Sequence, residues 1–329
     1  MSSINIDVRN DAAYVGRFAP SPSGPLHFGS LVCALASYLH AKQHNGRWLV
    51  RIEDIDTPRV NSAMNDVILS SLHAHHLYSD EPVVYQSHRH TLYEKTLSQL
   101  RSMHRIYACE CSRKQIKARS GYYDGHCRDK SLAFAEHAIR FLQQQPRTAF
   151  CDMHLGKQNI THPIATEDPV LKRRDGIYAY HLAVVADDIA QEVTHIVRGM
   201  DLLDTTPIHL NLTEALDAVH PKYLHIPVIS QQVGEKLSKQ HHAPPIDDNR
   251  ALDNLKLALQ YLGIHRAFNP NLSNDMQKIT DIDTLLDWAI THWTHNLLPK
   301  QAEVLISVTN NVYSMHERYE QTTSMKKSN

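Results

Sequence analysis

The fold is decided by residues 17–30, which read RFAPSPSGPLHFGS. Residues 14–18 are a short strand candidate that leads into this Pro-, Gly- and Ser-rich loop, and apolar residues between positions 31 and 39 then recur at helical spacing. Residues 48–52 read as a second strand. We therefore expect a strand–loop–helix–strand unit whose two strands are parallel in one sheet. The loop then lies at the carboxyl end of the first strand, where open parallel sheets bind ligands.

The loop contains groups that suit a nucleotide. The N-terminus of the helix that follows it offers free N–H groups and a positive dipole end to phosphate. Gly24 and Gly29 allow the backbone to approach a nucleotide closely, and His27 can donate a ring N–H to a phosphate oxygen. An ordinary loop before a capped helix is the alternative, which the combination with Arg17 and three prolines disfavours.

The remaining chain predicts an α/β protein with a break in its middle. A cysteine-rich, basic and loop-like stretch begins near residue 106, and short strands are expected at 138–141 and 148–153. Alternating strands and helices return from residue 177, and beyond residue 242 the pattern is helical. The predicted domains are the first half of a Rossmann domain (1–103), an insertion (104–172), the second Rossmann half (173–241) and a C-terminal helical domain (242–329).

The composition is that of an ordinary globular protein. Of 329 residues, 34 are Lys or Arg and 35 are Asp or Glu, so the formal net charge is −1 with 24 His counted as neutral. Hydrophobic residues make up 42%, which excludes disorder as the dominant state. The near-neutral balance argues against coating nucleic acid by bulk charge but allows a local basic face. Because no signal peptide, no membrane-spanning run and no disulfide framework is evident, we expect a cytoplasmic protein.

A second loop, residues 236–240, reads KLSKQ and follows Gly234. Two lysines in a loop can neutralise a polyphosphate as charge builds during displacement at phosphorus. Taken alone, Lys236 and Lys239 are more simply explained as solvated surface charges. Together with the first loop they favour catalysis, because the two loops resemble the two signature sequences of class I aminoacyl-tRNA synthetases.

Further stretches resemble the glutamyl/glutaminyl branch of that family. They are RIEDID at 51–56, DPVLK at 168–172, YAYHLA at 178–183, VADD at 185–188 and IVRG at 196–199. The resemblance implies a class I synthetase-type Rossmann domain that binds glutamate, whose two carboxylates and one ammonium suit two arginines and a carboxylate. The implied glutamate ligands are Arg17, Ser21, Glu53, Tyr180 and Arg198; the implied ATP ligands are His27, Gly29, Ser30 and Lys239; and the implied catalytic residues are His27, Lys236 and Lys239.

A third constellation is formed by Cys109, Cys111 and Cys127. Three thiolates in a loop-rich insertion indicate a structural zinc, which needs four ligands in a tetrahedron. His126 is one candidate for the fourth ligand, although its neighbour Cys127 strains a shared tetrahedron. Tyr123, four residues before Cys127, has a more comfortable reach, and three free thiols without metal are the alternative.

The spacing Cys-x-Cys, eleven residues, Tyr, three residues and Cys resembles the glutamyl-queuosine tRNA(Asp) synthetases, truncated relatives of the glutamyl-tRNA synthetases. This resemblance implies one structural zinc (Zn2+) per chain, held by Cys109, Cys111, Tyr123 and Cys127. It also implies a small helical domain in place of a longer anticodon-binding region. Ser30 and Gln240 depart from the wider synthetase signatures and leave the predicted catalytic residues in place.

The resemblance also implies a reaction. L-glutamate is activated with ATP and Mg2+ without any need for tRNA, and is then transferred to queuosine, the modified base at the first anticodon position of tRNA(Asp). We expect the protein to be a monomer that binds tRNA(Asp) and does not bind membranes. Two alternatives stay open: a truncated glutamyl-tRNA synthetase that charges the 3′ end of tRNA, and a tRNA-binding relative without catalysis. Intact His27, Lys236 and Lys239 count against the second alternative.

Overall fold

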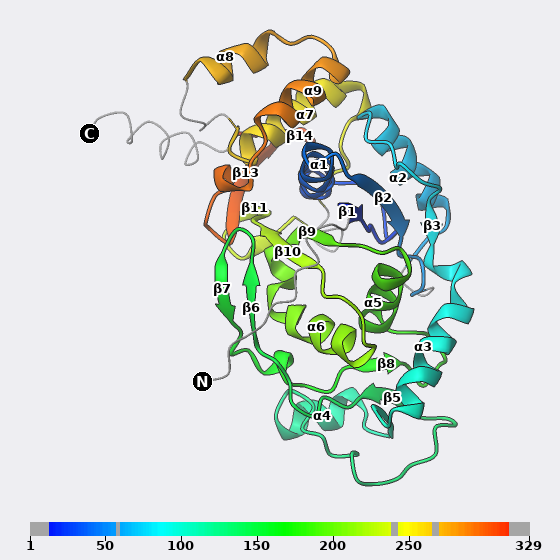
Figure 1. The fold of residues 1–329 in the computed structure, drawn as a ribbon. Coiled ribbons are helices and arrows are strands. Elements are labelled where there is room, and N and C mark those ends of the chain that lie inside the picture. The colour runs from blue at the N-terminus through cyan, green and yellow to red at the C-terminus, as the bar shows by residue number, and fades with distance from the viewer. Residues whose placement is uncertain (1–12, 57–59, 238–242, 265–269, 316–329) are drawn as a thin grey trace.

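The computed structural model describes residues 13–56, 60–237, 243–264 and 270–315 (Figure 1). Lys239, one of the predicted catalytic residues, lies outside the described residues, as does Gln240. None of the described helices is long and apolar enough to cross a membrane.

A seven-stranded sheet forms the centre of the molecule, in the order β3-β2-β1-β9-β10-β6-β7. Neighbouring strands are parallel except for β6 and β7, which form an antiparallel hairpin at one edge. The predicted parallel pairing of the first two strands is confirmed, since Val15 lies opposite Arg47 and Phe18 opposite Val50. The strands are β1 (Val15–Phe18), β2 (Arg47–Ile52), β3 (Val84–Tyr85), β6 (Ala149–Asp152), β7 (Gly156–Asn159), β9 (His195–Gly199) and β10 (Lys222–Ile226).

Helices lie on both sides of this sheet, with α1 on one side and α5 and α6 on the other (Figure 1). The predicted apolar face of α1 is confirmed, because Leu31 and Leu35 are fully buried in one core with Trp48. Gly46 follows the helix where no side chain fits, since a Cβ there would lie 2.6 Å from the Tyr14 carbonyl oxygen. The helices of this part are α1 (Phe28–Gln43), α2 (Ala63–Ala74), α3 (His90–Ser102), α5 (Tyr180–Ala190) and α6 (Thr206–Ala215), with the short 3-10 helices η1 (Gln86–His88), η2 (Pro163–Ala165) and η3 (Met200–Thr205).

The predicted insertion contains a small antiparallel sheet in the order β4-β5-β8. The stretch that we expected to be loop-like forms β4 and the short helix α4, because Ser112 and Gln115 make a reciprocal capping box at the start of that helix. The hairpin β6–β7 lies between β5 and β8 in the sequence but belongs to the central sheet, where Asp152 pairs with Tyr223 of β10. The elements are β4 (Ile106–Cys109), α4 (Arg113–Arg119), β5 (Ala138–Phe141) and β8 (Val170–Lys172).

The C-terminal part is mixed rather than purely helical. The expected helices are present as α7 (Ala251–Tyr261), α8 (Pro270–Lys278) and α9 (Ile282–His292), with the 3-10 helices η5 (Asp248–Arg250) and η7 (His295–Leu297). The expectation of a helical domain is wrong for residues 303–315, which form β13 (Glu303–Thr309) and β14 (Val312–Met315). These strands complete a four-stranded sheet with β11 (Val228–Gln232) and β12 (Glu235–Lys236), because β11 pairs in parallel with β13. The strands β10 and β11 are separated only by Pro227, which cannot donate a backbone hydrogen bond to a sheet.

Candidate active site

The carboxyl ends of three parallel strands bring together four of the predicted glutamate ligands. Arg17 is in β1, Glu53 directly follows β2, Arg198 is in β9, and Tyr180 opens α5. Burial raises the pKa of Tyr180, and the charges of Arg198, Glu53 and Arg17 all act on its hydroxyl. The four side chains therefore lie within electrostatic reach of one another, although they are far apart in sequence.

Arg17 is held by Asp188, a carboxylate to which we assigned no role from the sequence. Its Nε and Nη2 atoms donate to the two oxygens of Asp188 at 3.2 and 3.3 Å. Burial acts to lower the pKa of Arg17, but the charge and the hydrogen bonds of Asp188, together with Tyr180 and Glu53, outweigh burial and raise the pKa. Asp188 uses the side edge of the guanidinium. Within the described residues no hydrogen bond is made by the end edge, formed by Nη1 and the second Nη2 hydrogen, which can therefore take a bidentate partner.

Glu53 stands beside a second buried arginine. Arg51 is fully buried, with its Nη2 atom 2.8 Å from Asp188 Oδ1 and 3.8 Å from Glu53 Oε1. Glu53 Oε1 itself is buried without a hydrogen-bond partner. Burial raises the pKa of Glu53 to about 7, against the lowering effect of Arg51 and Arg17. A buried carboxylate oxygen without a donor is costly unless a ligand supplies one.

More of the N–H groups of Arg198 than of Arg17 are already used in hydrogen bonds within the protein. Its Nε donates to His225 Nε2 at 3.1 Å, and its Nη1 pairs with His209 Nδ1 at 3.0 Å. Its Nη2 donates to the Leu202 carbonyl at 3.1 Å and to Thr206 Oγ1 at 2.7 Å. Of the five N–H groups of an arginine, one on Nη1 remains for a substrate.

The first signature loop lies directly in front of α1. His27 is the N-cap residue of this helix, where its Nδ1 accepts the Ser30 N–H at 3.3 Å and its Nε2 lies 3.2 Å from Ser30 Oγ. A Cβ on Gly29 would meet the His27 ring at 3.3 Å and the Ile229 side chain at 3.6 Å, so glycine keeps the helix start close to β11. Ser21 is exposed in the same loop.

Lys236 lies in β12, and its charge acts on α1, the helix that follows the first loop. Lys236 forms an ion pair with Asp201 of η3. Burial raises the pKa of the Cys33 thiol on α1 to about 11, and the charges of Arg17, Asp201 and Lys236 all act on that thiol. The described part of the second signature therefore lies in the electrostatic neighbourhood of the first.

Sequence reasoning missed the acidic residues beneath the site. Asp187 is fully buried and accepts hydrogen bonds from Gln86 at 2.8 Å and from the Tyr93 hydroxyl at 2.8 Å. Arg89 donates to it at 2.5 Å. A signal was present, because two adjacent carboxylates on an apolar helix and Arg51 in an apolar strand must be paired when buried.

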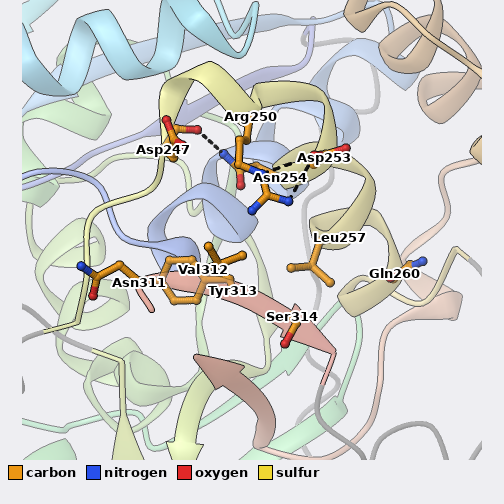
Figure 2. Close-up of a pocket in the computed structure, with 10 residues that line it drawn as sticks. All are labelled: Asp247, Arg250, Asp253, Asn254, Leu257, Gln260, Asn311, Val312, Tyr313 and Ser314. Atoms are coloured by element: carbon orange, nitrogen blue, oxygen red, sulfur yellow. Dashed lines mark hydrogen bonds and ion pairs between the residues drawn. The ribbon is translucent and has the colours of Figure 1, made fainter. Parts of the chain in front are cut away.

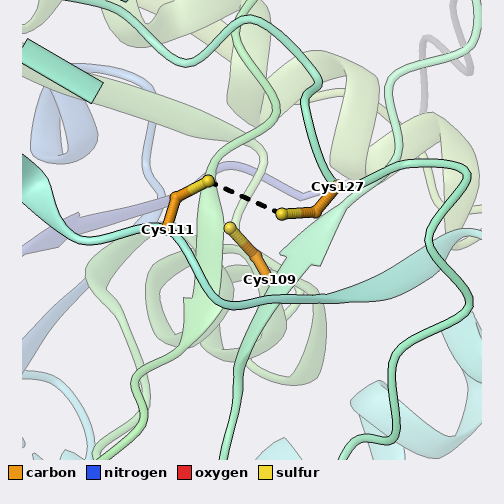
Figure 3. A group of neighbouring side chains, drawn as sticks. All are labelled: Cys109, Cys111 and Cys127. Atoms are coloured by element: carbon orange, nitrogen blue, oxygen red, sulfur yellow. Dashed lines mark hydrogen bonds between the residues drawn. The ribbon is translucent and has the colours of Figure 1, made fainter. Parts of the chain in front are cut away.

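The three predicted thiol ligands converge in the insertion (Figure 3). The sulfur atoms of Cys109, Cys111 and Cys127 all lie within 4.8 Å of one another, so they could hold a metal ion. Tyr123 is buried beside them, where its hydroxyl accepts the Cys127 N–H at 2.8 Å and interacts with the Cys109 thiol. The donor set of three thiols and one phenol fits zinc, whose structural sites take four ligands.

The polar side-chain atoms of two neighbouring residues that could also serve as the fourth ligand, His126 and Tyr122, contact other partners. His126 is exposed, and its Nε2 lies 2.9 Å from Lys130 Nζ. Tyr122 is exposed as well, and its hydroxyl lies 3.2 Å from His162 Nε2. Of the three candidates, only Tyr123 has its polar atom among the thiols.

One surface cavity lies away from these residues. A cavity of about 230 Å³ separates α7 from β14, with Asp247, Arg250, Asp253 and Tyr313 among the residues that line it (Figure 2). Arg250 is already paired with Asp253 at 3.3 Å. None of the predicted site residues lines this cavity.

Comparison with known proteins agrees with this arrangement of strands and signatures. The family model described as tRNA synthetases class I (E and Q), catalytic domain, matches residues 14–294. The Glutamyl-Q tRNA(Asp) synthetase of Vibrio vulnificus is 44% identical over 298 residues, which cover 91% of this chain and 95% of the relative. The protein of the same name from Idiomarina loihiensis is 50% identical over 251 residues, covering 76% of this chain and 89% of the relative.

A solved structure shows the same fold. The glutamate tRNA ligase from Elizabethkingia meningosepticum, in complex with its amino acid, superposes with a TM-score of 0.72 at 25% identity. The match covers 88% of this chain and 66% of that ligase. The family model and the relatives agree on one assignment. This chain belongs to the class I tRNA synthetases of the E and Q type.

Proposed function

We propose that the protein activates L-glutamate with ATP and transfers the glutamyl group to the queuosine base in the anticodon of tRNA(Asp). The relatives that it matches over most of their length bear the name Glutamyl-Q tRNA(Asp) synthetase. The observation that carries the proposal is that two groups of opposite charge have hydrogen-bonding positions with no partner among the described residues. They are the end edge of the Arg17 guanidinium and the Oε1 atom of Glu53. An amino acid presents the complementary carboxylate and ammonium.

Glutamate is held by groups of three kinds. The end edge of Arg17 forms a bidentate pair with one carboxylate, and Glu53 accepts the ammonium. Arg198 donates its remaining N–H to the second carboxylate, next to Tyr180. Ser21, which is exposed in the loop after β1, contributes its hydroxyl to glutamate binding.

Activation joins glutamate to the α-phosphate of ATP. The glutamate α-carboxylate attacks that phosphorus, forming glutamyl-adenylate and releasing pyrophosphate. His27 and the first turn of α1, including Gly29 and Ser30, bind phosphate oxygens, because a helix N-terminus stabilises negative charge. Lys236 and Lys239 balance the charge that builds on the leaving pyrophosphate, and Mg2+ accompanies the ATP.

Transfer breaks the bond between the activated carboxyl carbon and the phosphate oxygen. A queuosine hydroxyl attacks that carbon, so the glutamyl group becomes an ester and AMP leaves with the electron pair of the broken bond. The hydroxyl proton goes to solvent or to a base that we do not assign. In the insertion, Cys109, Cys111, Cys127 and Tyr123 hold one structural zinc that fixes the loop around α4.

The activation step is tested by pyrophosphate exchange with glutamate and ATP in the absence of tRNA. We expect glutamate-dependent exchange, and we expect Lys239→Ala to lose most of it. Exchange that requires added tRNA(Glu) would favour a truncated glutamyl-tRNA synthetase instead. Undiminished exchange by Lys239→Ala would remove the catalytic role of that lysine.

The acceptor is tested with labelled glutamate and two preparations of tRNA(Asp), one with queuosine and one with guanosine at the same anticodon position. We expect label only on the queuosine-containing tRNA. Periodate cleaves the diol of the 3′ terminal ribose, so a treated tRNA cannot be charged at its 3′ end. If the queuosine diol is protected during that treatment, we expect the tRNA to be labelled as before. Equal labelling of both tRNAs would contradict the queuosine assignment.

A further inference from the structure

Five polar side chains from five elements form a continuous hydrogen-bonded chain through Arg198. His225 Nδ1 lies 2.7 Å from Asp152 Oδ2, and Arg198 Nε donates to His225 Nε2 at 3.1 Å. Arg198 Nη1 lies 3.0 Å from His209 Nδ1, and His209 Nε2 lies 3.0 Å from His181 Nδ1. Asp152, Arg198, His209 and His225 are each at most 3% exposed.

The direction of every hydrogen bond in this chain follows from the arginine. A guanidinium only donates, so His225 Nε2 and His209 Nδ1 must both accept. The proton of each neutral ring then sits on the other nitrogen. His225 Nδ1–H therefore donates to Asp152, and His209 Nε2–H donates to His181 Nδ1.

The two ends of the chain are fixed. At one end, Asp152 also accepts the backbone N–H groups of His225 at 3.0 Å and of His154 and Leu155 at 2.9 Å, as an ionised carboxylate does. At the other end, the Tyr180 ring packs against the His209 and His181 rings, with centroids 5.4 Å apart in both cases. The chain therefore runs from the hairpin β6–β7 to the predicted glutamate pocket.

We propose that His209 and His225 are positioning residues for glutamate, because they hold the Arg198 guanidinium so that its one uncommitted N–H faces the substrate carboxylate. This inference rests on the proposed function, and specifically on Arg198 as a glutamate ligand. Neither histidine needs to touch substrate. Each supplies an acceptor that fixes the plane of the guanidinium, and a fixed donor loses less entropy when substrate binds.

The kinetic test compares variants that lose the acceptor with variants that keep one. His209→Leu and His225→Leu remove the ring nitrogens that face Arg198. In His209→Asn an amide oxygen lies near the position of Nδ1, and in His225→Gln one lies near the position of Nε2. We expect the two Leu variants to raise the KM for glutamate about 10–100-fold in pyrophosphate exchange, as for loss of hydrogen bonds to a charged group. The KM for ATP should stay unchanged, and the amide variants should recover most of the loss.

A spectroscopic test needs no variant. Nitrogen-15 spectra of the histidine rings at neutral pH should show His225 with its proton on Nδ1 and His209 with its proton on Nε2. Addition of glutamate should shift these ring nitrogens, whereas ATP alone should not.

Two results would overturn the inference: the opposite tautomers, or Leu variants whose KM for glutamate equals that of the parent protein. A parent protein without any glutamate-dependent exchange would instead overturn the proposed function, so the two failures are distinguishable.

Discussion

At the scale of single residues, the two arginines of the site differ in what their neighbours leave available. Both were expected to form bidentate pairs with glutamate carboxylates. Asp188 occupies only the side edge of Arg17, whereas the partners of Arg198 leave it a single N–H. Arg17 is therefore the residue suited to a bidentate carboxylate pair, and Arg198 the residue suited to one hydrogen bond.

Glu53 gives the activation step a pH dependence. Because burial raises its pKa to about 7, the carboxylate is fully charged only above that pH and can then bind the substrate ammonium. We expect kcat/KM for glutamate to rise as the pH increases towards 7 and then to level off. Glu53→Gln should abolish this rise and lower kcat/KM about 10–100-fold. Initial rates of pyrophosphate exchange measured across pH check this, and an unchanged profile in Glu53→Gln would contradict it.

The same carboxyl group affects stability with the opposite sign. Its folded pKa lies above the ordinary value of 4.5, so the unfolded state loses its proton first as the pH rises. The contribution of Glu53 to stability is therefore present at low pH and is lost between about pH 4.5 and pH 7. Thermal unfolding at pH 8 should show that Glu53→Gln is more stable than the parent protein. A less stable variant would contradict this and would indicate that the substitution removes an important packing contact.

Asp188 joins two buried cations, and its removal should be costly. Asp188→Asn removes the carboxylate that Arg17 and Arg51 share and leaves only the more distant Asp187 and Glu53 beside Arg51, at 3.7 and 3.8 Å, which we expect to destabilise the fold by about 3–5 kcal/mol. Urea unfolding measures this difference. The matched control is Asp129→Asn, since Asp129 is exposed and its neutralisation should change stability by no more than about 0.5 kcal/mol. Equal stability of the two variants would show that the buried charges are not coupled.

At the scale of elements, the cysteine loop and α4 depend on a shared centre. The capping box, the thiol cluster and the Arg119–Asp124 ion pair organise this stretch, and Ile116 of α4 is only partly buried against the cluster. A bound metal would supply the missing stability, as in other small metal-held loops.

Zinc analysis of purified variants tests this centre. We expect one zinc in the parent protein and its loss in Cys127→Ser. Tyr123→Phe keeps the ring under Arg140, which lies 3.6 Å from its centroid, but removes the hydroxyl. Its zinc affinity, measured by competition with a chelator, should fall by at least the roughly 10–100-fold that is typical of losing an outer-shell partner. His126→Ala should bind zinc as the parent does, and a loss there instead would move the fourth ligand to His126.

At the scale of the whole molecule, histidines connect the central sheet to the C-terminal part. The rings of His40 and His195 surround Tyr14, with centroid distances of 5.5 and 4.1 Å. His40 also accepts the Trp293 indole N–H at 3.2 Å, next to His295. Burial lowers the pKa of His40 to about 3 and of His195 to about 4. The cluster is therefore neutral, and it holds α1, β9 and the segment after α9 together.

This cluster should make the fold sensitive to acid. Unfolded histidines take up protons near pH 6.5, while His40 and His195 resist protonation in the fold, so the free energy of unfolding should fall as the pH drops from 6.5 to 4. His195→Phe keeps the stack on Tyr14 and should reduce that slope by up to about 1.4 kcal/mol per pH unit. Denaturant unfolding at several pH values measures the slope. His73→Phe, at an exposed position, is the control that should leave the slope unchanged.

Local patterns were sufficient for much of the fold. The spacing of apolar residues predicted α1, α7 and α9, and the loop between Phe18 and His27 predicted the first strand–helix crossover, because these signals act over a few residues. The strands β13 and β14 were missed although residues 303–309 read EVLISVT, a stretch rich in β-branched residues. Asn310 and Asn311 then adopt the positive φ of a tight hairpin turn, a signal that the sequence did contain.

The sequence by itself determined which chemical groups are offered to the predicted sites: the signature loop with His27, the lysine loop, the two arginines and the cysteine spacing. Only the tertiary structure decided which hydrogen-bonding positions of those groups are already filled by other parts of the protein. Arg17 and Asp188 are 171 positions apart, and nothing in their spacing shows that one occupies an edge of the other. The physical reason is that a hydrogen-bond donor has few directions, and only the packing of distant strands and helices decides which of them are filled by the protein and which are left for glutamate.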